Sequence, residues 1–354
     1  MNYLRGVFLL FMSFFIVESA SAAQSDFTYD FDQTGYFYRG IAGLGLFEDP
    51  VTHNRENETQ GTVSMNVQAN PLKGIVYWHG YGPSYWSGVP EAGNSNVTFN
   101  GNAVTGTALP QGSGGEYGVG FKADVTQYLS TGTHNYTLGN VSFYQQGNSS
   151  NKGINNGFSV VSVSEDTTNN PNNYGRLVIA SGSDEAWHGF TGNNGPNTGV
   201  FGINFNPVDY DRQAQITLII AGGEDKDSLP GIDRANRPNY LWSWTASSGA
   251  IPASLVHSAG TRYSSIYPAA ARSGYDWDNY SFALDLPANV SRLALQMESE
   301  NINNSSSNGE SFSWVGASIF LPEEAPIIVP EPASIGILSL LLPFVLRRKF
   351  LRRP

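Results

Sequence analysis

The sequence predicts an all-β protein: an antiparallel β-sandwich of jelly-roll type, followed by a hydrophobic helix at the C-terminus. Three observations favour this fold. Charged residues make up only 14 % of the chain, against roughly 25 % in an ordinary soluble domain. Gly, Tyr and Phe are abundant, with 39, 18 and 20 copies, which is typical of turns and strands. Between residues 24 and 321, apolar residues alternate with period two, and helical periodicity is scarce.

The predicted strands follow from local patterns. Apolar and polar residues alternate in 62–69, as in a half-buried strand, and 75–78 is a continuous apolar run suited to a strand covered on both faces. Asn100-Gly101, between Val97-Thr98-Phe99 and Ala103-Val104, predicts a tight hairpin turn. The remaining predicted strands are 135–138, 141–144, 158–163, 177–180, 216–221, 281–286, 292–297 and 313–320.

These strands belong to a surface domain over 23–325, which forms one large sandwich or two consecutive ones. The Gly- and Asn-rich stretch 189–199 is the best internal boundary, because it separates halves of similar strand content. No internal repeat decides between the two arrangements. Residues 322–330 carry three prolines and predict an extended stalk.

Residues 1–22 have the three parts of a secretory signal peptide. Arg5 supplies the positive charge, 7–17 form an apolar stretch, and Ala20-Ser21-Ala22 offers a small-residue cleavage site. The apolar stretch is shorter than the roughly 20 residues that span a membrane. We therefore expect an exported chain whose mature form begins near Ala23.

The C-terminal residues 326–354 combine three features in a fixed order. Pro330-Glu331-Pro332 precedes an apolar stretch, 334–346, and a basic cluster follows at Arg347, Arg348 and Lys349. Such a cluster holds a chain on the cytoplasmic side of a membrane. This arrangement resembles the PEP-CTERM sorting signal of Gram-negative bacteria, although Pro343 interrupts the apolar stretch.

The resemblance to PEP-CTERM proteins implies a partner and a location. The partner is an exosortase-like enzyme that processes the chain near Pro330-Glu331-Pro332, after transient insertion of a transmembrane helix into the inner membrane. The processed protein is then expected at the cell surface or in the extracellular matrix, where it is associated with exopolysaccharide and biofilm.

A second resemblance covers residues 26–321. The blocks 72–80 (LKGIVYWHG), 97–101 (VTFNG), 123–126 (ADVT), 157–163 (GFSVVSV) and 276–282 (DWDNYSF) occur in this order. They resemble blocks of DUF3344, a family of bacterial and archaeal surface proteins. The resemblance implies a β-rich surface module and carries no assigned active site.

Charge and cysteine content exclude several classes of function. The net charge is −11, and the central chain, without six basic and two acidic residues near the termini, has 13 basic and 28 acidic residues. Nucleic acid binding needs clustered Lys and Arg, so it is not expected. The chain has no Cys, which excludes disulfides, thiolate metal sites and cysteine nucleophiles.

Candidate catalytic and metal-binding residues are few. The five His residues show no ligand spacing, and no Gly-x-Ser-x-Gly motif occurs. The acid pairs 165–166, 184–185 and 224–225 are the candidates for a glycosidase, which needs two carboxyl groups across a cleft. Asp225, Asp227 and Asp233 are a weak candidate site for Ca²⁺. We otherwise expect no cofactor and no enzymatic activity.

Two aromatic clusters are candidate glycan-binding sites, because exposed rings stack on sugar faces; core packing is the alternative for both. One cluster contains Tyr81, Tyr85 and Trp86, among Gly and Pro residues. The other contains Tyr240, Trp242 and Trp244, which alternate and so share one face of a strand.

The sequence as a whole predicts an exported, non-enzymatic structural or adhesive module associated with exopolysaccharide. The alternatives are a secreted carbohydrate-active enzyme, a lectin-like carbohydrate-binding domain, and a matrix component that self-associates.

Overall fold

The computed structural model describes residues 27–46, 58–81, 92–110, 118–143, 154–187, 196–222, 239–265, 277–299 and 312–326. These residues confirm the predicted fold class, since they form large sheets in which all paired strands are antiparallel. The signal peptide, the sorting signal with its helix, the Ca²⁺ candidates Asp225, Asp227 and Asp233, and the aromatic residues Tyr85 and Trp86 lie outside the described residues. Within those ranges, no helix is long and apolar enough to cross a membrane.

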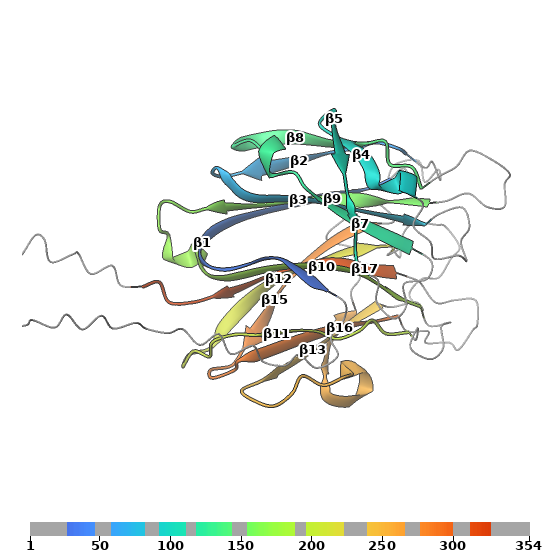
Figure 1. Ribbon diagram of the computed structural model, residues 1–354. Helices are drawn as coiled ribbons and strands as arrows, with labels where there is room; N and C mark the ends of the chain where they lie inside the picture. Colours follow the sequence, from blue (N-terminus) through green and yellow to red (C-terminus); the bar gives the residue numbers. More distant parts are fainter. Residues whose placement is uncertain are drawn as a thin grey trace, which may run out of the picture.

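The described strands form three sheets, one of nine strands and two of four. The nine-stranded sheet has two halves that share β1, here called the upper and lower inner sheets, so the strands stack in four layers, seen from the side in Figure 1. The upper outer sheet contains β2 (Gly61–Val67), β8 (Gly132–Gly139), β4 (Asn96–Phe99) and β5 (Asn102–Thr105). The upper inner sheet contains β9 (Ile154–Glu165), β3 (Pro71–Tyr81), β7 (Gly118–Asp124) and β6 (Thr107–Ala108). The lower inner sheet contains β10 (Tyr174–Ala186), β17 (Phe312–Pro322), β12 (Arg212–Ala221) and β15 (Trp277–Leu286). The lower outer sheet contains β11 (Phe201–Asn204), β16 (Arg292–Ser299), β13 (Asn239–Ala246) and β14 (Thr261–Ser265).

Four short helical turns complete the described structure. They are η1 (Ala92–Ser95), η2 (Thr126–Tyr128), η3 (Pro171–Asn173) and η6 (Leu255–Ala259). Each lies in a connection between two strands.

The long strand β1 (Thr28–Gly45) joins the two inner sheets. Its first half pairs with β10 in the lower inner sheet, and its second half pairs with β9 in the upper inner sheet. Glycine is required where β1 passes close to other strands. A Cβ atom at Gly43 would lie 2.5 Å from the Asn279 amide nitrogen and 2.6 Å from the Ser159 hydroxyl.

Three apolar cores fill the spaces between the layers. The alternation in β3 shows how one strand serves two of them. Val76 and Trp78 face the upper outer sheet, whereas Ile75 and Tyr77 face the lower inner sheet, and all four are buried. The continuous apolar run at 75–78 is therefore a strand covered on both faces, as predicted. The core between the lower sheets contains Trp314, Phe312 and Leu293.

Strands from both sides of the stretch 189–199 pair with each other. β10 precedes the stretch and pairs with β17, which follows it. The two halves of the chain therefore share the lower inner sheet.

The structure contains a strand at every predicted position except 141–144, of which it describes 141–143. Val141 and Phe143 are fully buried in the upper core, but their backbone is irregular. The Phe143 amide donates to the side-chain oxygen of Asn155 at 3.0 Å rather than to the backbone of a neighbouring strand. The apolar pattern there reflects core packing. The predicted hairpin is confirmed, since Asn100 and Gly101 both have positive φ angles, 51° and 79°.

Candidate functional site

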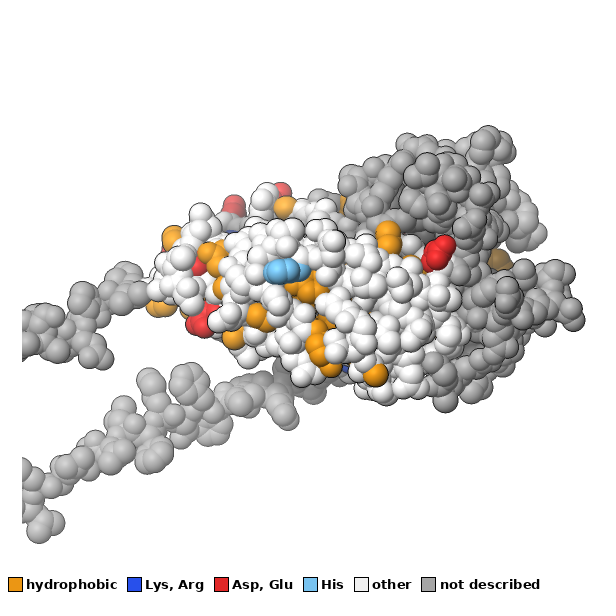
Figure 2. All heavy atoms as spheres, turned by 90° about the horizontal axis from the view of Figure 1, so that it is seen from above, with side chains coloured by type: hydrophobic (Ala, Val, Ile, Leu, Met, Phe, Trp, Pro, Cys, Tyr) orange, Lys and Arg blue, Asp and Glu red, His pale blue; other side chains and the backbone are white. Residues whose placement is uncertain are grey.

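The outward face of the upper outer sheet is open and uncharged. Its four strands contain no Asp, Glu, Lys or Arg. In β2, Val63, Met65 and Val67 are buried, whereas the alternate side chains are exposed. Figure 2 looks down on this side of the molecule, where most described atoms are white, the colour of the backbone and of side chains that are neither hydrophobic nor charged. The face is formed mainly by hydroxyl and amide side chains: Thr62, Ser64, Asn66, Asn96, Thr98, Thr105, Thr133, Asn135 and Thr137.

These side chains are ordered in cross-strand pairs. Thr62 lies opposite Thr137, with 2.8 Å between their hydroxyl oxygens, and Ser64 lies opposite Asn135. The face therefore presents rows of hydrogen-bond donors and acceptors without formal charge. Sequence reasoning did not single out this face. Its signal was the regular alternation of Thr, Ser and Asn with Val and Met in 62–67.

The lower outer sheet has an aromatic outward face that is covered at its centre. Tyr240, Trp242 and Trp244 share this face of β13, as their alternation predicts. Trp242 is only 7 % exposed. Its indole nitrogen donates to Glu298 Oε2 at 2.7 Å, and His257 Nε2 lies 3.1 Å from the other Glu298 oxygen.

The segment 251–259 forms the cover. The backbone amides of Leu255 and Val256 both donate to Gln296 Oε1, at 2.6 and 3.2 Å. The imidazole of His257 packs against Trp242, with ring centres 5.0 Å apart. His257 has a φ of 51°, in the left-handed region that non-glycine residues rarely adopt. These contacts make Trp242 part of a small satellite core.

The flanking rings of this cluster are half-buried. Tyr240 and Trp244 pack against the same satellite core. The guanidinium of Arg262 lies 4.4 Å from the centre of the Tyr240 ring, close enough for a cation–π interaction. The three aromatic residues therefore lie on one face without forming a continuous open platform.

Tyr81 is not the exposed loop residue that the sequence suggested. It is the last residue of β3 and is only 5 % exposed. Its hydroxyl donates to Glu185 Oε1 at 3.3 Å, and its ring lies beside His79. Gly118 on β7 leaves the space for both rings, since a Cβ there would lie 2.9 Å from Tyr81 and 2.4 Å from His79. Packing between the inner sheets explains the position of Tyr81.

His79 is fully buried between the inner sheets. Its Nδ1 lies 2.9 Å from the Asn156 side-chain oxygen. Burial lowers the pKa of His79 to about 4, so the ring is neutral at pH 7. His134 lies on the exposed end of β8, and His257 lies in the lower cover. Within the described ranges, no three His, Cys, Asp or Glu side chains are arranged to hold a metal ion.

The acid pairs that lie within the described residues do not share a cleft. Asp184 and Glu185 are both buried in β10, and the strand's alternation points them to opposite faces. Asp184 accepts a hydrogen bond from the Gly199 amide at 2.6 Å, whereas Glu185 accepts one from Tyr81. Adjacent carboxylates on opposite sides of a sheet cannot act on one glycosidic bond.

Asp166, the buried member of the pair 165–166, organises a turn. Burial raises the pKa of this carboxyl, but hydrogen bonds from Thr168 and Asn173 outweigh that effect and hold the pKa at about 2. Glu165 is exposed on β9. The residues of the third pair, 224–225, lie outside the described part of the chain.

Comparisons with known proteins do not assign the chain to a family. No family model matches the chain, and no curated protein matches it. Among solved structures, the chain is similar to PNGase F, a glycosylasparaginase from Flavobacterium meningosepticum, with a TM-score of 0.26. The two sequences are 10 % identical, and the match covers 85 % of this chain and 96 % of that one. It is also similar to the plant receptor-like kinase ANX2, at 10 % identity, 84 % and 90 % coverage and a TM-score of 0.22. A third similarity is to the infectious bursal disease virus VP2 subviral particle, at 10 % identity, 86 % and 74 % coverage and a TM-score of 0.26. At these TM-scores the similarities carry no argument about function.

Proposed function

We propose that this protein is an exported, non-enzymatic module of the cell surface or extracellular matrix that adheres to neutral exopolysaccharide. The observation that carries the proposal is the open, uncharged face of the upper outer sheet. Hydroxyl and amide groups exchange hydrogen bonds with sugar hydroxyls, and both partners are neutral. A chain with an excess of acidic residues would repel an acidic polymer through its other surfaces.

The terminal signals supply the address in this proposal. Residues 1–22 direct export, and 326–354 hand the chain to an exosortase-like enzyme at the inner membrane. The last described strand, β17, lies in the lower inner sheet. A tether that continues from β17 therefore starts two layers away from the uncharged face.

A charge placed on the face tests the proposal. In the purified exported protein, Asn135→Lys should reduce retention on insoluble cellulose and on immobilised dextran about tenfold, because a charge must be desolvated at the contact. Asn206→Lys, an exposed change beside the lower outer sheet, is the matched control and should keep full retention. Thermal melts of both variants should match that of the wild type.

Two outcomes would contradict this function. Equal retention of Asn135→Lys and wild type would show that the face makes no contact with the polymer. Release of reducing sugar by the wild type would favour the carbohydrate-active enzyme.

A further inference from the structure

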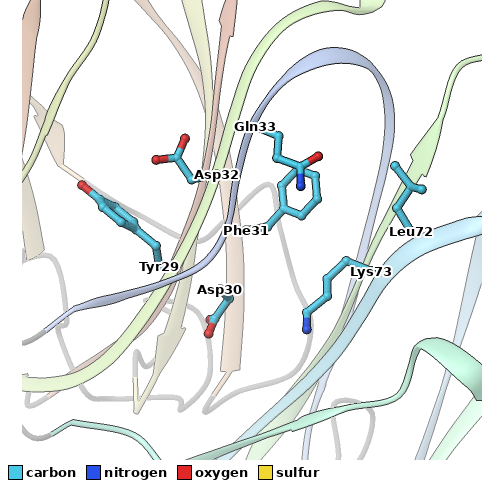
Figure 3. A pocket seen from close by; sticks show the side chains of 7 residues that line it. All are labelled: Tyr29, Asp30, Phe31, Asp32, Gln33, Leu72 and Lys73. Atoms are coloured by element: carbon cyan, nitrogen blue, oxygen red, sulfur yellow. The ribbon is translucent and has the colours of Figure 1, made fainter. Parts of the chain in front are cut away.

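A pocket of about 530 Å³ lies where the first half of β1 faces the start of β3. Five consecutive β1 residues, 29–33, line it together with Leu72 and Lys73. Figure 3 shows Phe31 and Gln33 on the side of β1 that faces Leu72 and Lys73, whereas Tyr29 and Asp32 extend on the other side. The volume falls within the roughly 300–1,000 Å³ of ordinary small-molecule sites.

The lining of the pocket includes two large hydrophobic residues that are exposed. Among the described residues, Tyr29 and Leu72 are the large hydrophobic residues that remain exposed, at 49 % and 47 %. Both line this pocket. A lining that combines apolar side chains with a few polar groups is typical of a ligand pocket.

The charges that line the pocket are already neutralised. Three ion pairs connect a lining residue to a partner outside the lining: Asp30 with Lys122 at 2.5 Å, Asp32 with Arg176 at 2.7 Å, and Lys73 with Asp124 at 2.6 Å. Asp30 also accepts hydrogen bonds from Tyr77 and Ser181, at 2.7 and 2.6 Å, so its position is fixed. A charged ligand would have to compete with these pairs, whereas a neutral ligand would not.

The backbone of β1 favours a small ligand over an added strand. Among the described strands, the first half of β1 pairs with β10 alone, and none of them pairs with its other edge. The register of its pairing with β10 shifts between Tyr29 and Phe31. A bulge of this kind disfavours pairing with another strand. The open edge instead offers backbone donors and acceptors to a compact polar molecule.

We propose that this pocket binds a neutral sugar unit at the end or on a branch of a polysaccharide. Leu72 would contact the apolar face of the ring, and the Gln33 amide, which is exposed and makes no side-chain hydrogen bond within the described structure, would bond to its hydroxyls. Lys73 and the open backbone edge of β1 supply further donors and acceptors. The proposal rests on the proposed polysaccharide association and adds a defined subsite to it.

The test uses short ligands that are too small to engage the whole uncharged face. Tetrasaccharides of glucose and of N-acetylglucosamine, with trigalacturonate as the anionic comparison, are titrated at millimolar concentration into the purified protein and followed by calorimetry. We expect a neutral tetrasaccharide to bind, Gln33→Ala to weaken it about fivefold, and Leu72→Trp, which fills the pocket, to abolish it. Gln213→Ala, an exposed glutamine on β12 that bonds to Asp285, is the matched control and should leave binding unchanged.

The outcomes separate this proposal from the proposed function. The pocket proposal alone would be overturned if no neutral tetrasaccharide bound while cellulose or dextran still retained the protein and Asn135→Lys still reduced that retention. Equal binding by wild type, Gln33→Ala and Leu72→Trp would also overturn it. Binding of trigalacturonate alone would overturn the neutral class of ligand. Loss of both polymer retention and short-ligand binding would overturn both proposals.

Discussion

The two outer sheets have the same number of strands, but the side chains on their outward faces differ in chemistry. Each packs its inward face against an inner sheet and buries a large apolar core. The lower outer sheet carries Tyr240, Trp242 and Trp244 outward and is covered by 251–259. The upper outer sheet carries Thr, Ser and Asn outward and is open.

This difference shows how side-chain chemistry decides which sheet face stays available. Water disfavours exposed apolar area in proportion to its size, so an aromatic stripe on an outer sheet favours a cover. The cover also needs polar anchors, which Gln296 and Glu298 provide from β16. Rows of hydroxyls and amides are well solvated and need no cover. On the lower outer sheet, the central ring of the predicted aromatic site, Trp242, is therefore closed off by the fold.

Replacing Trp242 should give the largest effect. We expect Trp242→Ala to lower the free energy of unfolding by about 3–5 kcal/mol, because the ring is buried and its removal leaves a cavity under His257. Urea unfolding measures this loss. Thr133→Ala on the upper outer sheet is the control and should stay within about 0.5 kcal/mol of wild type. A stable Trp242→Ala protein that has lost polysaccharide retention would reverse the contrast between the two sheets.

Acid should destabilise the inner sheets that both outer sheets rest on. The pKa of His79 is about 4 in the folded protein and about 6.5 in an unfolded chain, so the unfolded state binds more protons between these values. Stability is then fully present above pH 6.5 and falls by about 3 kcal/mol as the pH drops to 4. His79→Gln, which does not titrate, should show a flatter dependence in this window. Parallel curves for the two proteins would exclude His79 as the cause.

The smallest effect should come from the exposed threonine pair of the upper outer sheet. Thr62→Val and Thr137→Val each remove one partner of the 2.8 Å hydroxyl contact. We expect each to change the free energy of unfolding by less than about 1 kcal/mol, and a double-mutant cycle to give a coupling of about 0.5 kcal/mol. A coupling of several kcal/mol would mean that the open face stabilises the fold as strongly as the covered one.

Local patterns in the sequence predicted many of the strands that have a single uniform environment, although β7, β11 and β14 were not predicted. The period-two run in 62–67 and the apolar run in 75–78 each lie in one sheet. The turn at Asn100-Gly101 requires positive φ angles, and these two adjacent residues adopt them. β1 escaped prediction because it changes sheets along its length. Its glycines serve close approaches to other strands, so neither a clean alternation nor an apolar run appears.

The sites were less predictable than the strands, since exposure depends on layers that are distant in sequence. Trp242 is covered by the nearby segment 251–259, but its indole bonds to Glu298, 56 residues along the chain. Tyr81 is buried by β7 and β10, and the pocket beside Gln33 requires β1 and β3 to meet. None of these contacts leaves a local signal in the residues that form the site.

The sequence by itself determined an all-β fold with antiparallel strands, because alternation, turn residues and low charge act within a few residues of one another. Only the tertiary structure decided that the sheets stack in four layers, that β1 joins the inner two, and which outer face is open. The physical reason is that burial is a property of neighbouring sheets. The same period-two strand has a covered or a solvated outer face according to what packs above it.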